Sequence, residues 1–196
     1  MNNLQNDMKI QINPWFATPV FNTQISDDFC NNLIQKVSKD KDTWKKGLEN
    51  VNALTCGWDG LQKYEELKII SSLVTQYILP QIGKVQKWKY NNWSCIDAWI
   101  NFYQKGDSAE LHFHKFSDYC AVLILKPGNG NLVFVPSDSV EGKYRNFYNV
   151  ENQKINEKKG TLILFPDYIY HKVTDCENER ISVAFNFKNQ SIKENK

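Results

Sequence analysis

The spacing of apolar positions divides the chain into a helical first part and a strand-rich second part. Apolar residues recur at helical spacing over residues 29–37, behind Ser26 and two aspartates that suit a helix N-terminus. A second helical pattern covers residues 64–79, and Pro80 is expected to end it. The pattern therefore predicts two helices ahead of the strands.

From residue 93 onward, short apolar or alternating segments are separated by turn residues. Residues 96–103 alternate, which turns Ala98 and Ile100 to one face and Trp99 and Asn101 to the other. Residues 126–131 predict a hairpin turn, whereas the charged residues 38–52 predict turns without strands. Further strands are predicted over residues 12–25, 119–125, 132–135, 144–150, 161–165, 168–173 and 181–187.

Two helices followed by short strands predict a mostly β (α+β) protein. The strands suit a sandwich or barrel, and the helices are expected to cover one of its faces. A length of 196 residues suits a single domain over 1–196. The polar ends, residues 1–11 and 189–196, are expected to be flexible.

Composition and charge exclude several classes of protein. The net charge is +2 and no basic stripe occurs, which argues against a strong nucleic-acid binder. The polar start predicts no signal peptide, and no apolar run is long enough for a membrane span. The 5 cysteines are scattered without a C-x-x-C motif. A reduced, cytoplasmic protein is therefore expected, in a bacterium or in a phage-infected host cell.

The chain has 3 histidines, and their placement suggests a metal site. His112 and His114 are two residues apart, so on a β-strand both side chains leave the same face. His171 ends a distant strand-like segment. Neutral imidazole is a good ligand for zinc, copper, iron or nickel. A single H-x-H motif is weak evidence, because most histidines are surface or core residues, but the distant third histidine strengthens the interpretation.

Arg180 and Ser182 share a face of the last predicted strand by the same period of two. An arginine inside a β-barrel needs an anionic partner, and its fork matches a carboxylate. The alternative is an arginine at the barrel mouth, paired with a protein carboxylate or with water. The spacing does not choose between the two.

Several motifs together resemble the iron(II)/2-oxoglutarate-dependent dioxygenases, most of all those of bacteria and bacteriophages. The resemblance covers residues 12–187 and rests on order and spacing as well as on residue types. The motifs are Pro14 to Phe21, Gly57-Trp58, Trp99-Ile100-Asn101, Tyr103-x2-Gly106-x5-His112-x-His114, Gly160-x-Leu162-x2-Phe165-Pro166-x4-His171, Arg180-x-Ser182 and Asn186.

The resemblance implies a double-stranded β-helix (jelly-roll, cupin-like) core that binds iron(II), with 2-oxoglutarate and O2 as co-substrates. It implies His112 and His171 as iron ligands. It also implies that Arg180 pairs with the far carboxylate of 2-oxoglutarate, with hydrogen bonds from Ser182 and Tyr103. The activity implied is hydroxylation of an unactivated C–H bond, with release of succinate and CO2.

One position departs from the superfamily's usual pattern of two histidines and one carboxylate. His114 stands where an aspartate or glutamate is usual. Either three histidines form the triad, or a carboxylate elsewhere is the third ligand, with Asp118 as the first candidate and Glu110 and Asp107 behind it. The i, i+2 spacing favours His114. A histidine is also not the small residue of the related halogenases, so halogenation is not indicated.

Two other functions remain open from the sequence. A cupin-like three-histidine metalloenzyme would not use 2-oxoglutarate, and a non-catalytic jelly-roll would only bind. The substrate is expected to be a small molecule or a peptide side chain. Residues 137–159 form either a substrate-covering loop or a variable insertion, and the aromatic N-terminal arm could serve a homodimer.

The aromatic residues carry two further expectations. Trp58 lies between two glycines and is predicted to cover the core rather than to face the substrate. The lining of the site is expected to include Trp99, Tyr119, Phe134, Tyr168 and Tyr170, although most of these also suit the core.

Overall fold

The computed structural model describes residues 18–135 and 153–191. Among them, none of the helices combines the length and apolar character that a membrane span requires. In chain order, the elements are β1 (Phe21–Gln24), α1 (Asp27–Asp40), η1 (Lys41–Thr43), β2 (Lys45–Leu48), β3 (Val51–Thr55), α2 (Gly60–Lys63), α3 (Glu65–Leu73), η2 (Val74–Ile78), α4 (Leu79–Gln86), β4 (Trp93–Tyr103), β5 (Ser108–His112), β6 (Tyr119–Lys126), β7 (Leu132–Val135), β8 (Gln153–Lys154), β9 (Thr161–Pro166), β10 (Tyr170–Val173) and β11 (Arg180–Asn189).

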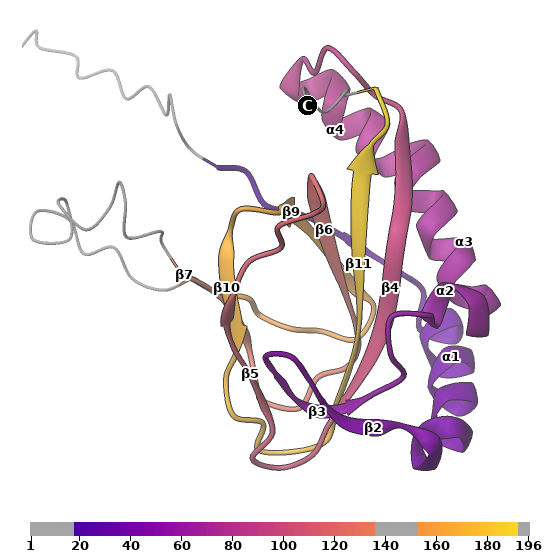
Figure 1. Ribbon diagram of the computed structural model, residues 1–196, viewed down its shortest axis with the longest axis vertical. Helices are drawn as coiled ribbons and strands as arrows, with labels where there is room; N and C mark the ends of the chain where they lie inside the picture. Colours follow the sequence, from indigo (N-terminus) through magenta and orange to yellow (C-terminus); the bar gives the residue numbers. More distant parts are fainter. Residues whose placement is uncertain (1–17, 136–152, 192–196) are drawn as a thin grey trace, which may run out of the picture.

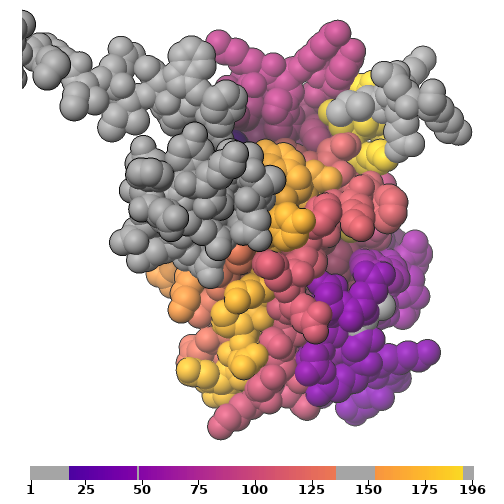
Figure 2. All heavy atoms as spheres, turned by 60° about the vertical axis from the view of Figure 1, so that its left-hand side comes forward, coloured from indigo at the N-terminus to yellow at the C-terminus, as the bar shows by residue number. Residues whose placement is uncertain are grey.

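The strands form two facing sheets that continue into each other through β3. Their order is β1-β9-β6-β11-β4-β3-β5-β10-β7-β8, with β2 beside β3. Strand β3 pairs with β4 at Leu54 and with β5 at Val51, so it joins the larger sheet to the smaller one. Seen from the side of the smaller sheet (Figure 2), the purple atoms around β2 and β3 lie against the pink atoms around β5. This arrangement confirms the predicted jelly-roll core.

The helices cover the outer face of the larger sheet, as predicted (Figure 1). Leu33 of α1 and Leu67 of α3 pack there against Ile100 of β4 and Val183 of β11. Strand β6 is apolar from Tyr119 to Leu125, where it is buried on both faces, and only Lys126 at its end is exposed. Its residues alternate between this cluster and a second cluster, between the sheets, to which Val122 belongs.

The first predicted helix is confirmed, and the predicted end of the second is wrong. Ser26 accepts a hydrogen bond from the backbone N–H of Phe29 at the start of α1. The second helix runs through Pro80 to the end of α4 because a π turn, η2, precedes the proline. In this turn Leu79 donates to the carbonyl of Val74, and Pro80 then occupies the first turn of α4, where its missing N–H costs nothing.

Two further predictions about local structure are corrected. Residues 38–52 contain β2 and the start of β3, whose alternating burial was hidden among charged residues. Residues 126–131 do not form a hairpin, because β6 pairs with β9 and β11 whereas β7 pairs with β8 and β10. This segment therefore crosses from the larger sheet to the smaller one.

The turn predicted before β9 is confirmed at Gly160. Its φ is +79°, and a Cβ there would lie 2.2 Å from the carbonyl oxygen of Ile25, so only glycine fits. The predictions for residues 1–17, 144–150 and 192–196 fall outside the described residues. Asn189, predicted within a flexible tail, is instead the buried end of β11.

Candidate metal centre

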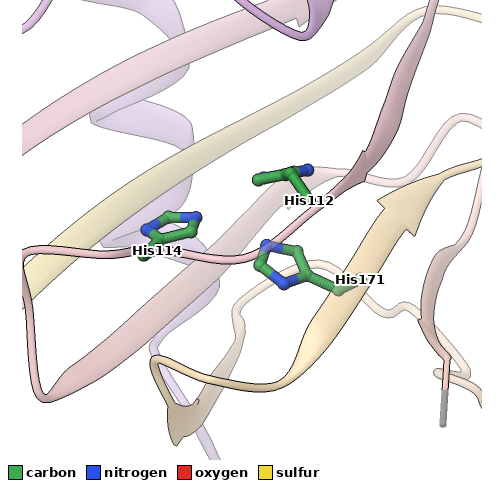
Figure 3. Close-up of side chains that lie close together, drawn as sticks. All are labelled: His112, His114 and His171. Carbon is green, nitrogen blue, oxygen red and sulfur yellow. The ribbon is translucent and has the colours of Figure 1, made fainter. Parts of the chain in front are cut away.

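Three histidines, two of them on paired strands and the third just beyond one strand end, converge at one end of the gap between the sheets (Figure 3). His112 ends β5 and lies directly opposite His171 of β10. His114 follows two residues after His112, beyond the end of the strand. One candidate ligand atom from each side chain lies within 4.8 Å of the other two. The structure thus brings together the three predicted ligands.

Hydrogen bonds fix the orientation of all three rings. The Nδ1 atoms of His112 and His171 donate to the backbone carbonyls of Glu110 and Ile169, at 2.7 and 2.9 Å. A carbonyl oxygen can only accept, so these Nδ1 atoms carry the hydrogen. The Nδ1 of His114 donates to Oδ1 of Asn186 at 2.5 Å. Each Nε2 is therefore left as a free lone pair, which is the form that binds a metal.

Burial keeps the three imidazoles neutral. It lowers the pKa of His112, lowers that of His114 to about 4, and lowers that of His171 well below its ordinary value. The mutual proximity of the rings adds to the shift at His114 and His171. At neutral pH no proton competes with a cation for these nitrogens.

The usual triad contains a carboxylate. Here a carboxylate, that of Asp97, lies behind His114 and not among the three candidate ligands. Asn186 of β11, which accepts from His114, lies opposite Asp97 of β4. Burial raises the pKa of Asp97, and its hydrogen bond with Asn186 opposes that rise. Asp97 thus lies behind His114 and is connected to it through Asn186. The sequence motif included Asn186 but did not identify Asp97.

The predicted 2-oxoglutarate residues lie on the same face of β4 and β11, deeper in the gap. Arg180 is opposite Tyr103, and its Cζ lies 5.1 Å from the centroid of that ring. The Nη1 atom of Arg180 donates to Ser182 at 2.8 Å. Burial raises the pKa of Tyr103 to about 12, so its phenol stays neutral. Arg180, Ser182 and Tyr103 line the same small cavity as the three histidines.

The guanidinium of Arg180 is fully buried and already holds a carboxylate. Nε and Nη2 donate to Oε2 and Oε1 of Glu157 at 2.9 and 2.7 Å. This pair shows that the fork of Arg180 suits a carboxylate in two-point contact, which fits the role predicted for it. Sequence reasoning missed Glu157, because nothing in its neighbourhood distinguishes it from other acidic residues of a polar loop.

A wider pocket of about 520 Å³ opens beside the histidines. Trp58 and Trp99 form its aromatic wall, with ring centroids 4.5 Å apart, and Trp99 stacks at 5.9 Å on His114. Trp58 is 43% exposed and lines this pocket while its ring packs edge-on against buried Trp99, so it covers the core, as predicted, and also faces the pocket. One oxygen of Asp97, Oδ1, is buried there without a hydrogen-bond partner among the described residues.

The alternative ligands lie apart from the three-histidine group. Asp118 accepts from the backbone N–H of Asn189 at 2.8 Å and lines a different pocket. Asp107 pairs with Lys46, and Glu110 is exposed. Of the aromatic residues expected in the lining, Tyr119 and Tyr168 also belong to that other pocket.

Comparisons with known proteins agree with this fold. Residues 97–186, from β4 to β11, match the model of a family described as "Putative 2OG-Fe(II) oxygenase". No curated protein sequence matches the chain significantly.

Solved structures of low sequence identity share the fold. A prolyl-4-hydroxylase from Pseudomonas putida is 16% identical with a TM-score of 0.66, over 88% of this chain and 94% of its own. A prolyl hydroxylase from Trichoplax adhaerens, in complex with a hypoxia inducible factor peptide, is 15% identical with a TM-score of 0.66, over 88% and 84%. HygX from Streptomyces hygroscopicus, with nickel, 2-oxoglutarate and hygromycin B bound, is 10% identical with a TM-score of 0.62, over 90% and 85%.

The fold and the convergent histidines define a jelly-roll protein with a candidate metal centre. The family match over residues 97–186 agrees with the predicted resemblance to the 2OG-Fe(II) oxygenases, and the solved structures share the fold.

Proposed function

We propose that this protein is a 2OG-Fe(II) oxygenase that hydroxylates an unactivated C–H bond of a small molecule or of a peptide side chain. In this proposal His112, His114 and His171 hold iron(II) through Nε2. Arg180 receives the far carboxylate of 2-oxoglutarate, with Ser182 and Tyr103 beside it. The observation that carries the proposal is the convergence of three oriented, neutral imidazoles on a cavity that also contains a buried guanidinium.

Each part of the chain has a separate task in this account. Bound iron, with 2-oxoglutarate and O2, supplies an oxidant able to attack an unactivated C–H bond. The carbonyls of Glu110 and Ile169, together with Asn186, hold the imidazoles in the orientation that a metal requires. Trp99 packs on His114 and keeps that side of the centre dry.

The wider pocket is the proposed substrate site. Its volume of about 520 Å³ lies within the range of small-molecule sites. Trp58 and Trp99 suit an apolar or flat group, and the unpaired oxygen of Asp97 suits a hydrogen-bond donor. The Trichoplax neighbour holds a peptide and HygX holds hygromycin B, so both substrate classes occur on this fold.

The cupin-like alternative has one observation in its favour. Arg180 is satisfied by Glu157, so its burial alone does not require a 2-oxoglutarate carboxylate. The family match over residues 97–186 favours the 2-oxoglutarate enzyme over this alternative.

The test is 2-oxoglutarate turnover with iron(II) and heavy-isotope O2, in the presence of prolyl peptides and of hygromycin B. We expect succinate to form in parallel with a product that has gained one labelled oxygen atom, and both to disappear in His171→Ala. Oxidation of a substrate by the iron-loaded protein at equal rates with and without 2-oxoglutarate would instead support the cupin-like enzyme.

A further inference from the structure

The position that the proposed function gives to the co-substrate is taken by a side chain of this protein. Glu157 makes a two-point ion pair with Arg180, and the two side chains are 3% and 1% exposed. Ser182 satisfies the remaining terminal nitrogen. A co-substrate carboxylate would make the same kind of pair.

The space beside this pair is too small for 2-oxoglutarate. The cavity that Arg180 shares with the three histidines has a volume of about 40 Å³. One water needs about 10–15 Å³ of such space, so the cavity holds a few waters at most and not a dicarboxylate such as 2-oxoglutarate. A chain that reaches from the metal to Arg180 therefore fits only if side chains in or next to this space move, and Glu157 contacts two residues of its lining, Arg180 and Leu132.

The balance of charges around Arg180 indicates that Glu157 is the side chain that moves. Arg180 is the only lysine or arginine among the described residues that line the cavity, and Glu157 already neutralises it. A carboxylate could approach the free edge between Nη1 and Nη2, next to Ser182. That arrangement would bury two negative charges against one positive charge, which is costly in a site without water. Exchange of one carboxylate for the other conserves the charge.

The surroundings of Glu157 also allow its side chain to move away from Arg180. It lies in the irregular segment between β8 and β9, where its Oε1 accepts a hydrogen bond from the backbone N–H of Leu132 at 2.8 Å. The same segment is held to β7 by Ile155, which donates to the carbonyl of Leu132. Withdrawal of Glu157 breaks its ion pair and frees the amide of Leu132 without breaking a strand of the two sheets.

We propose that Glu157 is an internal competitor of 2-oxoglutarate. It pairs with the guanidinium of Arg180 in the absence of 2-oxoglutarate and withdraws when the co-substrate binds. The inference rests on the proposed function of Arg180. Because Arg180 is free of Glu157 in only a fraction of the molecules, the apparent affinity for 2-oxoglutarate is lowered by that fraction. The segment that carries Glu157 thereby determines how readily the enzyme binds 2-oxoglutarate.

The test compares 2-oxoglutarate binding to the parent, Glu157→Gln and Glu179→Gln, each loaded anaerobically with iron(II), by calorimetry. Glu179 is the matched control, since it pairs with Lys126 at the surface. We expect at least tenfold tighter binding in Glu157→Gln and no change in Glu179→Gln. Equal or weaker binding in folded Glu157→Gln would make Glu157 a support for Arg180 and overturn the inference, while the proposed function would stand. Iron-loaded protein that binds no 2-oxoglutarate in any of the three would overturn both.

A second measurement needs no variant and is independent of any folding defect in Glu157→Gln. Hydrogen exchange of the Leu132 amide is followed in the iron-loaded parent while 2-oxoglutarate is added. Exchange at Leu132 should accelerate as Glu157 withdraws, although ligand binding stabilises the fold as a whole. Unchanged or slower exchange at saturating 2-oxoglutarate would contradict the proposal.

Discussion

His171 lies directly opposite His112 across the antiparallel pair of β10 and β5, and their ring centroids are 4.2 Å apart. Strand pairing thus sets the spacing of two candidate ligands from distant parts of the sequence. We expect His112→Ala and His171→Ala each to abolish iron retention, because two imidazoles do not complete the triad. Metal analysis after gel filtration checks this. Asp118→Asn is the control, and it should retain iron like the parent; loss of iron from that variant would return Asp118 to the ligand set.

His114 depends on Asn186 for its orientation. Asn186→Ala should weaken iron binding by about 10–100-fold, the usual effect of removing a partner behind a metal ligand. Asn186→Asp keeps an oxygen that accepts from His114 and should retain most of the affinity. Competition with a fluorescent chelator measures both. An unchanged affinity in Asn186→Ala would show that His114 is held by other contacts or is not a ligand.

The metal-free protein should lose stability on mild acidification. Burial holds the pKa of His114 at about 4 in the folded state, whereas an unfolded histidine titrates near about 6.5. Between these values the unfolded chain binds more protons, so the free energy of unfolding falls as pH falls. Urea unfolding across this window measures the loss. His114→Ala should lose less stability than the parent, and an equal loss would contradict the assigned cause.

Trp58 is expected to act on the substrate and not on the metal. Trp58→Ala removes an aromatic wall worth about 0.5–1.5 kcal/mol, so KM should rise several-fold while iron retention stays unchanged. Tyr77→Ala, a similarly exposed aromatic residue on η2, is the control. Steady-state kinetics with a substrate that the enzyme hydroxylates measures the change in KM. A parallel loss of iron would place Trp58 in the support of the centre.

Much of the fold could be read from the sequence because the period of two is strong in the inner strands. The alternation in β4 correctly separated Trp99 and Asn101 from Ala98 and Ile100. Pro80 was misjudged because a π turn upstream removes the need for its N–H, and no local pattern announces such a turn. The hairpin at 126–131 was misjudged because the turn residues of a hairpin and of a crossover are alike.

Only part of the candidate site could be predicted from the sequence. Histidine and arginine are rare enough to be noticed, and their spacing on strands placed them on one face. Asp97 and Glu157 could not be found this way, because each is one acid among 22 acidic residues and acquires a role only through its neighbours in space. The exposure of Trp58 to the wider pocket could not be predicted, because residues from other parts of the chain form that pocket.

The most direct test of the central claim is anaerobic absorption spectroscopy of the parent and Arg180→Lys with iron(II) and saturating 2-oxoglutarate. Lysine keeps the buried charge opposite Glu157 but loses the two-point fork. We predict a visible metal-to-ligand charge-transfer band in the parent, and at least tenfold more 2-oxoglutarate needed to produce it in Arg180→Lys. A parent protein that retains iron but shows no band at any 2-oxoglutarate concentration would contradict the account.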